Sequence, residues 1–246
     1  MFCNYLHQTI IDFVIPRLWP TYVQKRIRAT YFYFGSSLLV TAASAVVTFN
    51  RSNLIRLLVG RSIFFSFGLI VLTGMMVSSI PYKKGFGIKQ ALWLLHVVTI
   101  GTLLAPMCIL GGAVLTQAAS CTAGAIAGLS IVAICSPGKR FLSIGAPLGM
   151  GIGVIMTTTI ASAFASPSSA LGVGLYGITV YGGLILFSLF LLCDTQYIIV
   201  TAETYPVNHN DYGLPPYDPI NSAMSIYADV LNIFSYIAAI VNDTSK

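Results

Sequence analysis

Residues 171–200 read LGVGLYGITVYGGLILFSLFLLCDTQYIIV, an apolar run interrupted by one charged residue, Asp194. A helix needs about 20 consecutive apolar residues to cross the hydrocarbon core of a bilayer, so this run is long enough to span a membrane. The run is far longer than a barrel strand, and backbone groups in lipid must find their hydrogen bonds within the segment. It therefore predicts a transmembrane helix with an acid inside it.

The rest of the chain has the same character. Of its 246 residues, 8% are charged and 56% are hydrophobic, whereas a soluble protein carries roughly 25% charged residues. We expect an all-α polytopic membrane protein with no soluble domain: an N-terminal segment with a basic stretch (1–30), a seven-helix membrane domain (31–241) and a short tail (242–246). The predicted spans are 31–48, 57–80, 91–114, 117–135, 141–163, 171–200 and 220–241.

The net charge of +6 comes from bases in loops beside the spans. Membrane topology and anionic lipids explain them better than nucleic acid, which we exclude as a partner. With seven spans, nine bases fall on the side of the N-terminus, which predicts that this side faces the cytosol, or the matrix in a mitochondrion. They are Arg17, Lys25, Arg26, Arg28, Lys83, Lys84, Lys89, Lys139 and Arg140, against Arg51, Arg56 and Lys246 on the other side.

Two other residue types give weaker signals. The five cysteines are scattered without a CxxC pair, so we expect neither a disulfide framework nor a zinc site, and no cofactor. Glycines recur within spans, as at Gly124 and Gly128 or Gly182 and Gly183, and predict close packing within the bundle; the alternatives are a dimer face or a flexible point.

Two acids lie inside predicted spans, Asp194 in the sixth and Asp229 in the seventh. A buried carboxylate in a membrane is costly and usually marks an ion or proton pathway. Asp194 is nine residues before Glu203, where span 6 exits, and Asp229 is nine residues after Ile220, where span 7 enters. At 1.5 Å per residue, both lie roughly 13 Å from the same face, so we expect them at one level.

Polar residues continue from this pair toward the acidic connection between spans 6 and 7, which holds Glu203, Asp211 and Asp218 and lacks Lys and Arg. Helical spacing places polar residues of span 7 on one face, and a second set follows Asp194 in span 6. The predicted path-lining residues are Tyr197, Thr201, Glu203, Asp218, Asn221, Ser225 and Asn232, with Tyr236 at the far end of the span-7 stripe.

Two carboxylates about 4 Å apart repel by roughly 4 kcal/mol at an effective dielectric near 20. They would tend to share one proton. A divalent cation can displace that proton, and calcium fits because it takes oxygen ligands from carboxylates. Calcium binding by Asp194 and Asp229 would give either a proton-gated leak or an exchanger. The alternative is a structural pair that stays hydrogen-bonded and half-protonated.

Several motifs resemble the Bax-inhibitor-motif family, in particular its mitochondrial branch. The resemblance covers about residues 18–239 and is strongest in spans 6 and 7. The matching stretches read LLCDTQ (191–196), YDPIN (217–221) and SIYADVLNIF (225–234), with LWPTYVQKRIR (18–28), ALWLLH (91–96), ILGG (109–112) and GAPLG (145–149) elsewhere.

The resemblance implies a seven-helix fold in which the other six helices surround the last. It also implies a pH-sensitive calcium pathway whose paired-aspartate sensor falls on Asp194 and Asp229. For the mitochondrial branch it implies the inner membrane, calcium–proton exchange, a role in cristae organisation and cytochrome c retention, and protection from apoptosis. The expected partners are calcium, protons, the lipid bilayer and other inner-membrane proteins.

The sequence departs from the family pattern in two places. Relatives often end span 2 with an Arg that pairs with the span-6 Asp in the closed state, but residues 76–80 read MVSSI. Whether Lys83 or Lys84 replaces that Arg is open. Residues 1–16 are also short and poor in Arg and Ser, so an import presequence is not evident.

A competing hypothesis from another class is a membrane scaffold or apoptosis regulator whose aspartates are structural. Enzymatic activity is not expected, since the sequence contains no Ser/His pairing, HExxH or GxGD motif. The sequence fixes neither the oligomeric state nor the choice between channel and exchanger.

Overall fold

The computed structural model describes residues 19–51, 63–83, 85–136, 140–166, 168–207 and 213–245. Within these ranges the chain is helical and contains no β-strand, which confirms the predicted all-α class. The helices in chain order are α2 (Thr21–Phe49), α4 (Ile63–Ser79), α5 (Ile88–Leu104), η1 (Ala105–Leu110), α6 (Gly112–Cys135), η2 (Phe141–Ile144), α7 (Gly145–Phe164), α8 (Ala170–Gly177), η3 (Ile178–Gly182), α9 (Gly183–Thr204) and α10 (Pro219–Thr244).

Six helical stretches of the described chain are long and apolar enough to cross a membrane: Thr21–Phe49, Ile88–Leu110, Gly112–Cys135, Phe141–Phe164, Ala170–Thr204 and Pro219–Thr244. The predicted second span corresponds to α4, a shorter apolar helix of 17 residues. Part of that predicted span lies outside the described residues. The protein is therefore a multi-pass helical membrane protein, as the sequence predicts.

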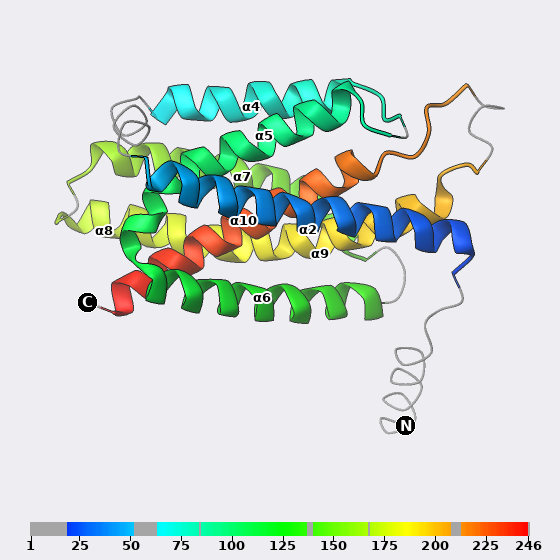
Figure 1. The fold of residues 1–246 in the computed structure, drawn as a ribbon. Helices are drawn as coiled ribbons and strands as arrows, with labels where there is room; N and C mark the ends of the chain where they lie inside the picture. Colours follow the sequence, from blue (N-terminus) through cyan, green and yellow to red (C-terminus); the bar gives the residue numbers. More distant parts are fainter. Residues whose placement is uncertain are drawn as a thin grey trace, which may run out of the picture.

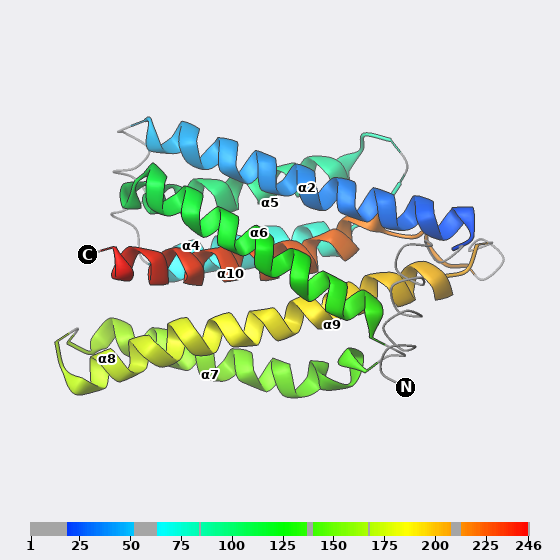
Figure 2. The same ribbon diagram turned by 90° about the horizontal axis from the view of Figure 1, so that it is seen from below.

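The last helix lies in the middle of the bundle (Figures 1 and 2). Of the candidate spans, α10 has the largest buried share, and it packs mainly on α2, α6 and α9. Helix α4 packs on α5, and α7 packs on α8 and α9, so both lie farther from α10. The start of α2, the α4–α5 connection and the α9–α10 connection share one end of the bundle, on the right in Figure 1.

The boundary between the third and fourth spans is earlier than predicted. Pro106 is the second residue of the 3₁₀ turn η1. The α-helix ends here because proline lacks an N–H and cannot continue the α-helical hydrogen bonds. Gly111 then turns the chain with a φ of 90°, a conformation that favours glycine. Span 4 therefore begins at Gly112 rather than at the predicted residue 117.

The glycine prediction is right at one place and wrong at another. Gly183 follows the π-helical turn η3, and a Cβ at this position would overlap the ring of Tyr236 on α10. By contrast, a Cβ at Gly124 or Gly128 would meet no atom within 4 Å in the described part of the chain. Close packing therefore requires glycine at the α9–α10 contact and not on this face of α6.

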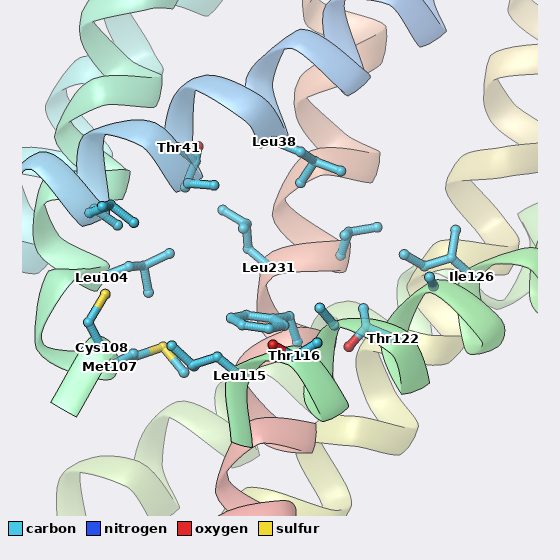
Figure 3. Close-up of a pocket in the computed structure, with 17 residues that line it drawn as sticks. Leu38, Thr41, Leu104, Met107, Cys108, Leu115, Thr116, Thr122, Ile126 and Leu231 are labelled. Carbon is cyan, nitrogen blue, oxygen red and sulfur yellow. The ribbon is translucent and has the colours of Figure 1, made fainter. Parts of the chain in front are cut away.

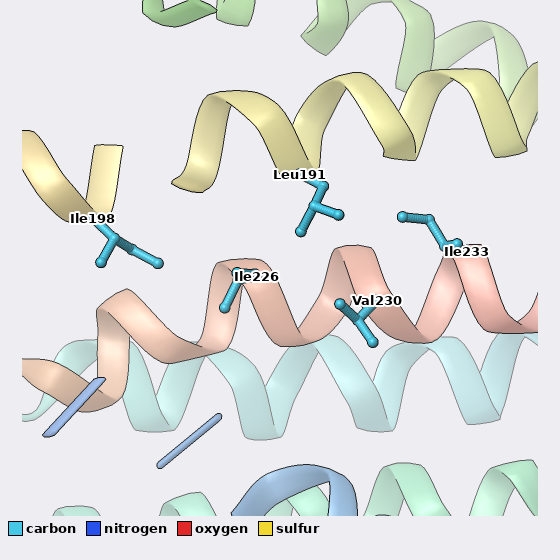
Figure 4. Close-up of a cluster of buried hydrophobic side chains, with 5 residues drawn as sticks. All are labelled: Leu191, Ile198, Ile226, Val230 and Ile233. Carbon is cyan, nitrogen blue, oxygen red and sulfur yellow. The ribbon is translucent and has the colours of Figure 1, made fainter. Parts of the chain in front are cut away.

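A core of buried aliphatic side chains joins α9 to α10. Leu191 and Ile198 on α9 belong to this core together with Ile226, Val230 and Ile233 on α10 (Figure 4), and all five are at most 3% exposed. Lipid tails are as apolar as these side chains, so the cluster stabilises the helix pair mainly through close van der Waals packing. The cluster fixes the register between the two helices that carry the intramembrane acids.

Candidate functional site

The connection between α9 and α10 sets the depth of the two intramembrane aspartates. Helix α9 ends at Thr204 and α10 begins at Pro219, so Asp194 and Asp229 each lie about ten residues from this end of the bundle. Asp218 caps α10, because its Oδ1 accepts hydrogen bonds from the N–H groups of Ile220 (3.0 Å) and Asn221 (3.1 Å). Proline at the first helical position is compatible with this cap.

The two intramembrane carboxyl groups, Asp194 and Asp229, lie close together. The side chains of Asp194 and Asp229 lie close enough to interact electrostatically, and Asp194 also lies near the Ser225 hydroxyl. Asp229 is 5% exposed, and its Oδ2 is buried without a hydrogen-bond partner among the described residues. A buried oxygen left in this way is costly unless a proton, water or cation satisfies it.

The residues beside Asp194 hold this turn of α9 in place. The Oε1 of Gln196 accepts a 3.0 Å hydrogen bond from the backbone N–H of Phe141, and the Sγ of Cys193 donates one of 2.8 Å to the Phe141 carbonyl. The Nε2 of Gln196 reaches the carbonyl of Ala133 at 3.3 Å. These contacts fix the rotation of α9 and direct Asp194 toward α10.

A cavity of about 650 Å³ leads from the α9–α10 connection to Asp194. We call it the polar cavity. Its walls come from the end of α4 and the residues after it, from α9, and from the start of α10. The lining residues are Ser78, Ser79, Ile80, Pro81, Tyr82, Asp194, Tyr197, Thr201, Tyr205, Pro215, Pro216, Tyr217, Asp218, Asn221, Ser222 and Ser225. The charged side chains among these lining residues are both acidic, which favours cations.

The structure brings together most of the residues that the sequence singled out, but not all of them. Tyr197, Thr201, Asp218, Asn221 and Ser225 line the polar cavity with Asp194. Glu203 and Asn232 do not: Glu203 is half-buried in the last turn of α9, and the amide of Asn232 donates a 2.8 Å hydrogen bond to Ala228 in its own helix. Tyr236 packs over Gly183. Arg17, Arg56, Lys84, Lys139, Asp211 and Lys246 lie outside the described residues.

The sequence predicts Lys89 only as one of the bases in loops beside the spans, so sequence reasoning misses its role at this site. Its side chain is buried, and its Nζ donates hydrogen bonds to Asp218 Oδ2 (2.5 Å), Asn221 Oδ1 (2.8 Å) and the Ile80 carbonyl (2.7 Å). We call Lys89 and these three partners the Lys89 cluster. Lys83, by contrast, is exposed, and its carbonyl accepts a hydrogen bond from Gln90. Lys89 is therefore a cation that binds three residues of the polar cavity wall.

Arg26 was also missed as part of this region. Its guanidinium donates to the carbonyls of Ala202 (2.9 Å), Tyr205 (2.8 Å) and Pro206 (3.1 Å) at the end of α9. It also lies over the ring of Tyr217, 5.3 Å from the centroid. Arg26 thus satisfies carbonyls that a helix end leaves free and ties α2 to the α9–α10 connection.

Tyr82 contributes a neutral hydroxyl to the mouth of the polar cavity. Burial, followed by its contact with Tyr33 and the nearby charge of Asp218, raises the pKa of Tyr82 to about 12. The phenol therefore stays protonated at physiological pH and can hydrogen-bond without adding charge.

A second cavity, of about 530 Å³, lies among α2, η1, α6 and α10. Its labelled side chains in Figure 3 are mostly aliphatic or sulfur-containing, and Leu231 of α10 projects into it. The hydroxyl of Thr122 is engaged by its own helix, at 2.7 Å from the Ala118 carbonyl. This cavity offers little to hold an ion.

Among the described residues, no group of three or more His, Cys, Asp and Glu side chains gathers to hold a metal. The intramembrane site is therefore a pair of carboxyl groups supplemented by neutral oxygens. The central helix α10 carries one acid of this pair, and an acidic cavity leads to the other. The protein is therefore a polytopic membrane protein with a buried ionisable centre.

Comparison with known proteins gives the family. Residues 23–246 match the family described as inhibitor of apoptosis-promoting Bax1, so the chain belongs to the Bax inhibitor family, as its motifs predict. It is also 43% identical over 227 residues to the growth hormone-inducible transmembrane protein of Rattus norvegicus. That alignment covers 91% of this chain, and the chain spans 64% of the length of that relative.

Proposed function

We propose that this protein moves calcium across the mitochondrial inner membrane, in exchange for protons or under proton control. Asp194 and Asp229 form the shared binding site. The observation that carries the proposal is the proximity of these two carboxyl groups, of which Asp194 lines the polar cavity. Protection from apoptosis, which the family description supports, and a role in cristae organisation would follow from the control of matrix calcium.

The chemistry of the pair favours exchange between a proton and a divalent cation. Two adjacent carboxylates repel in a low-dielectric environment, so a shared proton stabilises the pair when no cation is bound. A calcium ion supplies two positive charges and accepts both carboxylates as ligands, with further oxygens from hydroxyls and water. Ser225 and Asp229 Oδ2 offer such oxygens beside Asp194. Calcium binding would thus release the shared proton.

The surroundings of the pair support transport with access from one side at a time. The polar cavity reaches Asp194 from the α9–α10 connection. Beyond the pair, toward the C-terminal end of α10, Val230 and Ile233 are buried and Tyr236 packs against Gly183. An ion would need these contacts to separate before it could leave on the other side.

Calcium flux into proteoliposomes tests the proposal. We expect Asp194→Asn and Asp229→Asn each to abolish pH-dependent flux, because asparagine keeps the size of the side chain but cannot exchange a proton. Asp243→Asn is the matched control, since Asp243 lies at the exposed end of α10, where it accepts a 2.8 Å hydrogen bond from Tyr176. Unchanged flux in both pair variants would reject the site.

The same preparation separates an exchanger from a leak. With the membrane potential clamped and calcium equal on both sides, an exchanger driven by a pH gradient moves calcium uphill. A proton-gated leak moves none under those conditions and conducts only down a calcium gradient. Purified protein that carries no calcium in either assay would favour the scaffold hypothesis, in which the aspartates are structural.

A further inference from the structure

The oxygens of the Lys89 cluster are of the kinds that form a metal-cation site, and the ammonium group of Lys89 occupies the position of the cation. The Nζ of Lys89 can donate three hydrogen bonds, and all three reach oxygens: the Asp218 carboxylate, the Asn221 amide and the Ile80 carbonyl. Carboxylate, amide and backbone carbonyl oxygens are the ligands that calcium takes in proteins. The ammonium group is almost completely buried, with the side chain 1% exposed.

The cluster joins segments that are far apart in the sequence. Ile80 follows α4, Lys89 lies in the first turn of α5, and Asp218 and Asn221 begin α10. Ile80, Asp218 and Asn221 also line the polar cavity. A cation that enters from the α9–α10 connection therefore passes oxygens that already bind the Lys89 ammonium.

We propose that Lys89 is a tethered occupant of a divalent-cation site at the mouth of the polar cavity. While the ammonium is in place, it neutralises Asp218 and excludes a metal ion from these oxygens. Withdrawal of Lys89 leaves an anionic oxygen cage that binds calcium. The site itself does not depend on transport; only its role as a barrier to entering calcium rests on the proposed function.

Terbium binding tests the site without any transport assay. Tb³⁺ replaces calcium on oxygen ligands and luminesces when a nearby tyrosine absorbs light, and Tyr82, Tyr205 and Tyr217 line this cavity. Every variant is made on an Asp194→Asn background, so the signal does not report the intact aspartate pair. We expect Lys89→Met to bind Tb³⁺ about tenfold or more tightly than the matched Lys83→Met variant, because it removes a buried positive charge from the metal position.

Asp218→Asn added to Lys89→Met should return Tb³⁺ affinity to the level of the Lys83→Met control. This double variant should fold, since removing both partners of a buried ion pair is far less harmful than removing one. If Lys89→Met alone is unstable, millimolar calcium should restore its melting temperature, and should not change that of the double variant. Equal Tb³⁺ affinity in Lys89→Met and Lys83→Met, or an unstable Lys89→Met that calcium does not rescue, would overturn the proposal.

Discussion

The guanidinium of Arg26 donates a 2.8 Å hydrogen bond to the carbonyl oxygen of Tyr205, which joins the start of α2 to the end of α9. Two more carbonyls of this helix end are bound by the same group. A planar guanidinium can reach several acceptors at once, and an ammonium group cannot reproduce that geometry. Arg26 therefore determines where the α9–α10 connection begins, and with it one wall of the polar cavity.

We expect Arg26→Lys and Arg26→Ala to destabilise the protein, because each leaves half-buried carbonyls without their donor. Hydrogen bonds to a charged group contribute about 1.5–3 kcal/mol each, so Arg26→Ala should cost about 2 kcal/mol or more. The measurement is the thermal unfolding midpoint in detergent. Arg28→Ala is the control, since Arg28 is an exposed neighbour on the same helix. Equal midpoints for the two alanine variants would show that the Arg26 contacts contribute nothing.

Substitutions of two helical glycines by alanine should have opposite effects. At Gly183 a Cβ would overlap the Tyr236 ring, and overpacking of this kind costs about 1–3 kcal/mol. At Gly124 a Cβ meets open space, and alanine in a helix is favoured over glycine by about 0.5–1 kcal/mol. Thermal unfolding of both variants checks the signs. Tyr236→Leu should partly rescue Gly183→Ala, and a Gly183→Ala variant as stable as the parent would contradict this packing.

The hydroxyls of Thr41 on α2 and Tyr227 on α10 form a buried hydrogen bond of 2.5 Å. We expect Tyr227→Phe to lower the free energy of unfolding by about 1–3 kcal/mol, because it leaves the Thr41 hydroxyl without this partner. The double variant Thr41→Val with Tyr227→Phe should recover most of that loss, since it removes both polar groups. A double-mutant cycle in thermal unfolding measures the coupling, and strictly additive losses would exclude it.

The sequence predicts the parts of the site that depend on local pattern. The spans follow from the length of apolar runs, and the common depth of Asp194 and Asp229 follows from counting residues to the ends of two helices joined by one connection. Most of the predicted path also lines the polar cavity, because polar residues at helical spacing share a face. Asn232 departs from that path because its amide bonds within its own helix.

Lys89 and Arg26 could not be predicted in this way, because their roles depend on partners far along the chain. The Lys89 bond to Asp218 joins residues 129 positions apart, and the Arg26 bond to Tyr205 joins residues 179 positions apart. A basic residue near the end of a span is usually explained by topology or lipid headgroups. One signal was present: the connection that contains Asp218 lacks bases of its own, so a cation for Asp218 has to come from another segment.

Calcium binding should depend on pH with a definite sign. If the aspartate pair holds a proton that calcium must displace, lowering the pH favours the protonated form and weakens calcium binding. Equilibrium binding of calcium to purified protein at several pH values should therefore give lower affinity in acid. Asp243→Asn should follow the same pH dependence as the parent protein, whereas Asp229→Asn should lose it. Calcium affinity that is independent of pH in the parent protein would contradict a shared proton.

The most direct measurement is proton release on calcium addition to purified protein in weakly buffered detergent, followed with a pH indicator. At a pH at which the pair shares one proton, we expect about one proton to be released for each calcium ion bound. We expect no proton release in the Asp194→Asn and Asp229→Asn variants. Calcium binding without proton release in the parent protein, or equal release in the variants, would contradict the account.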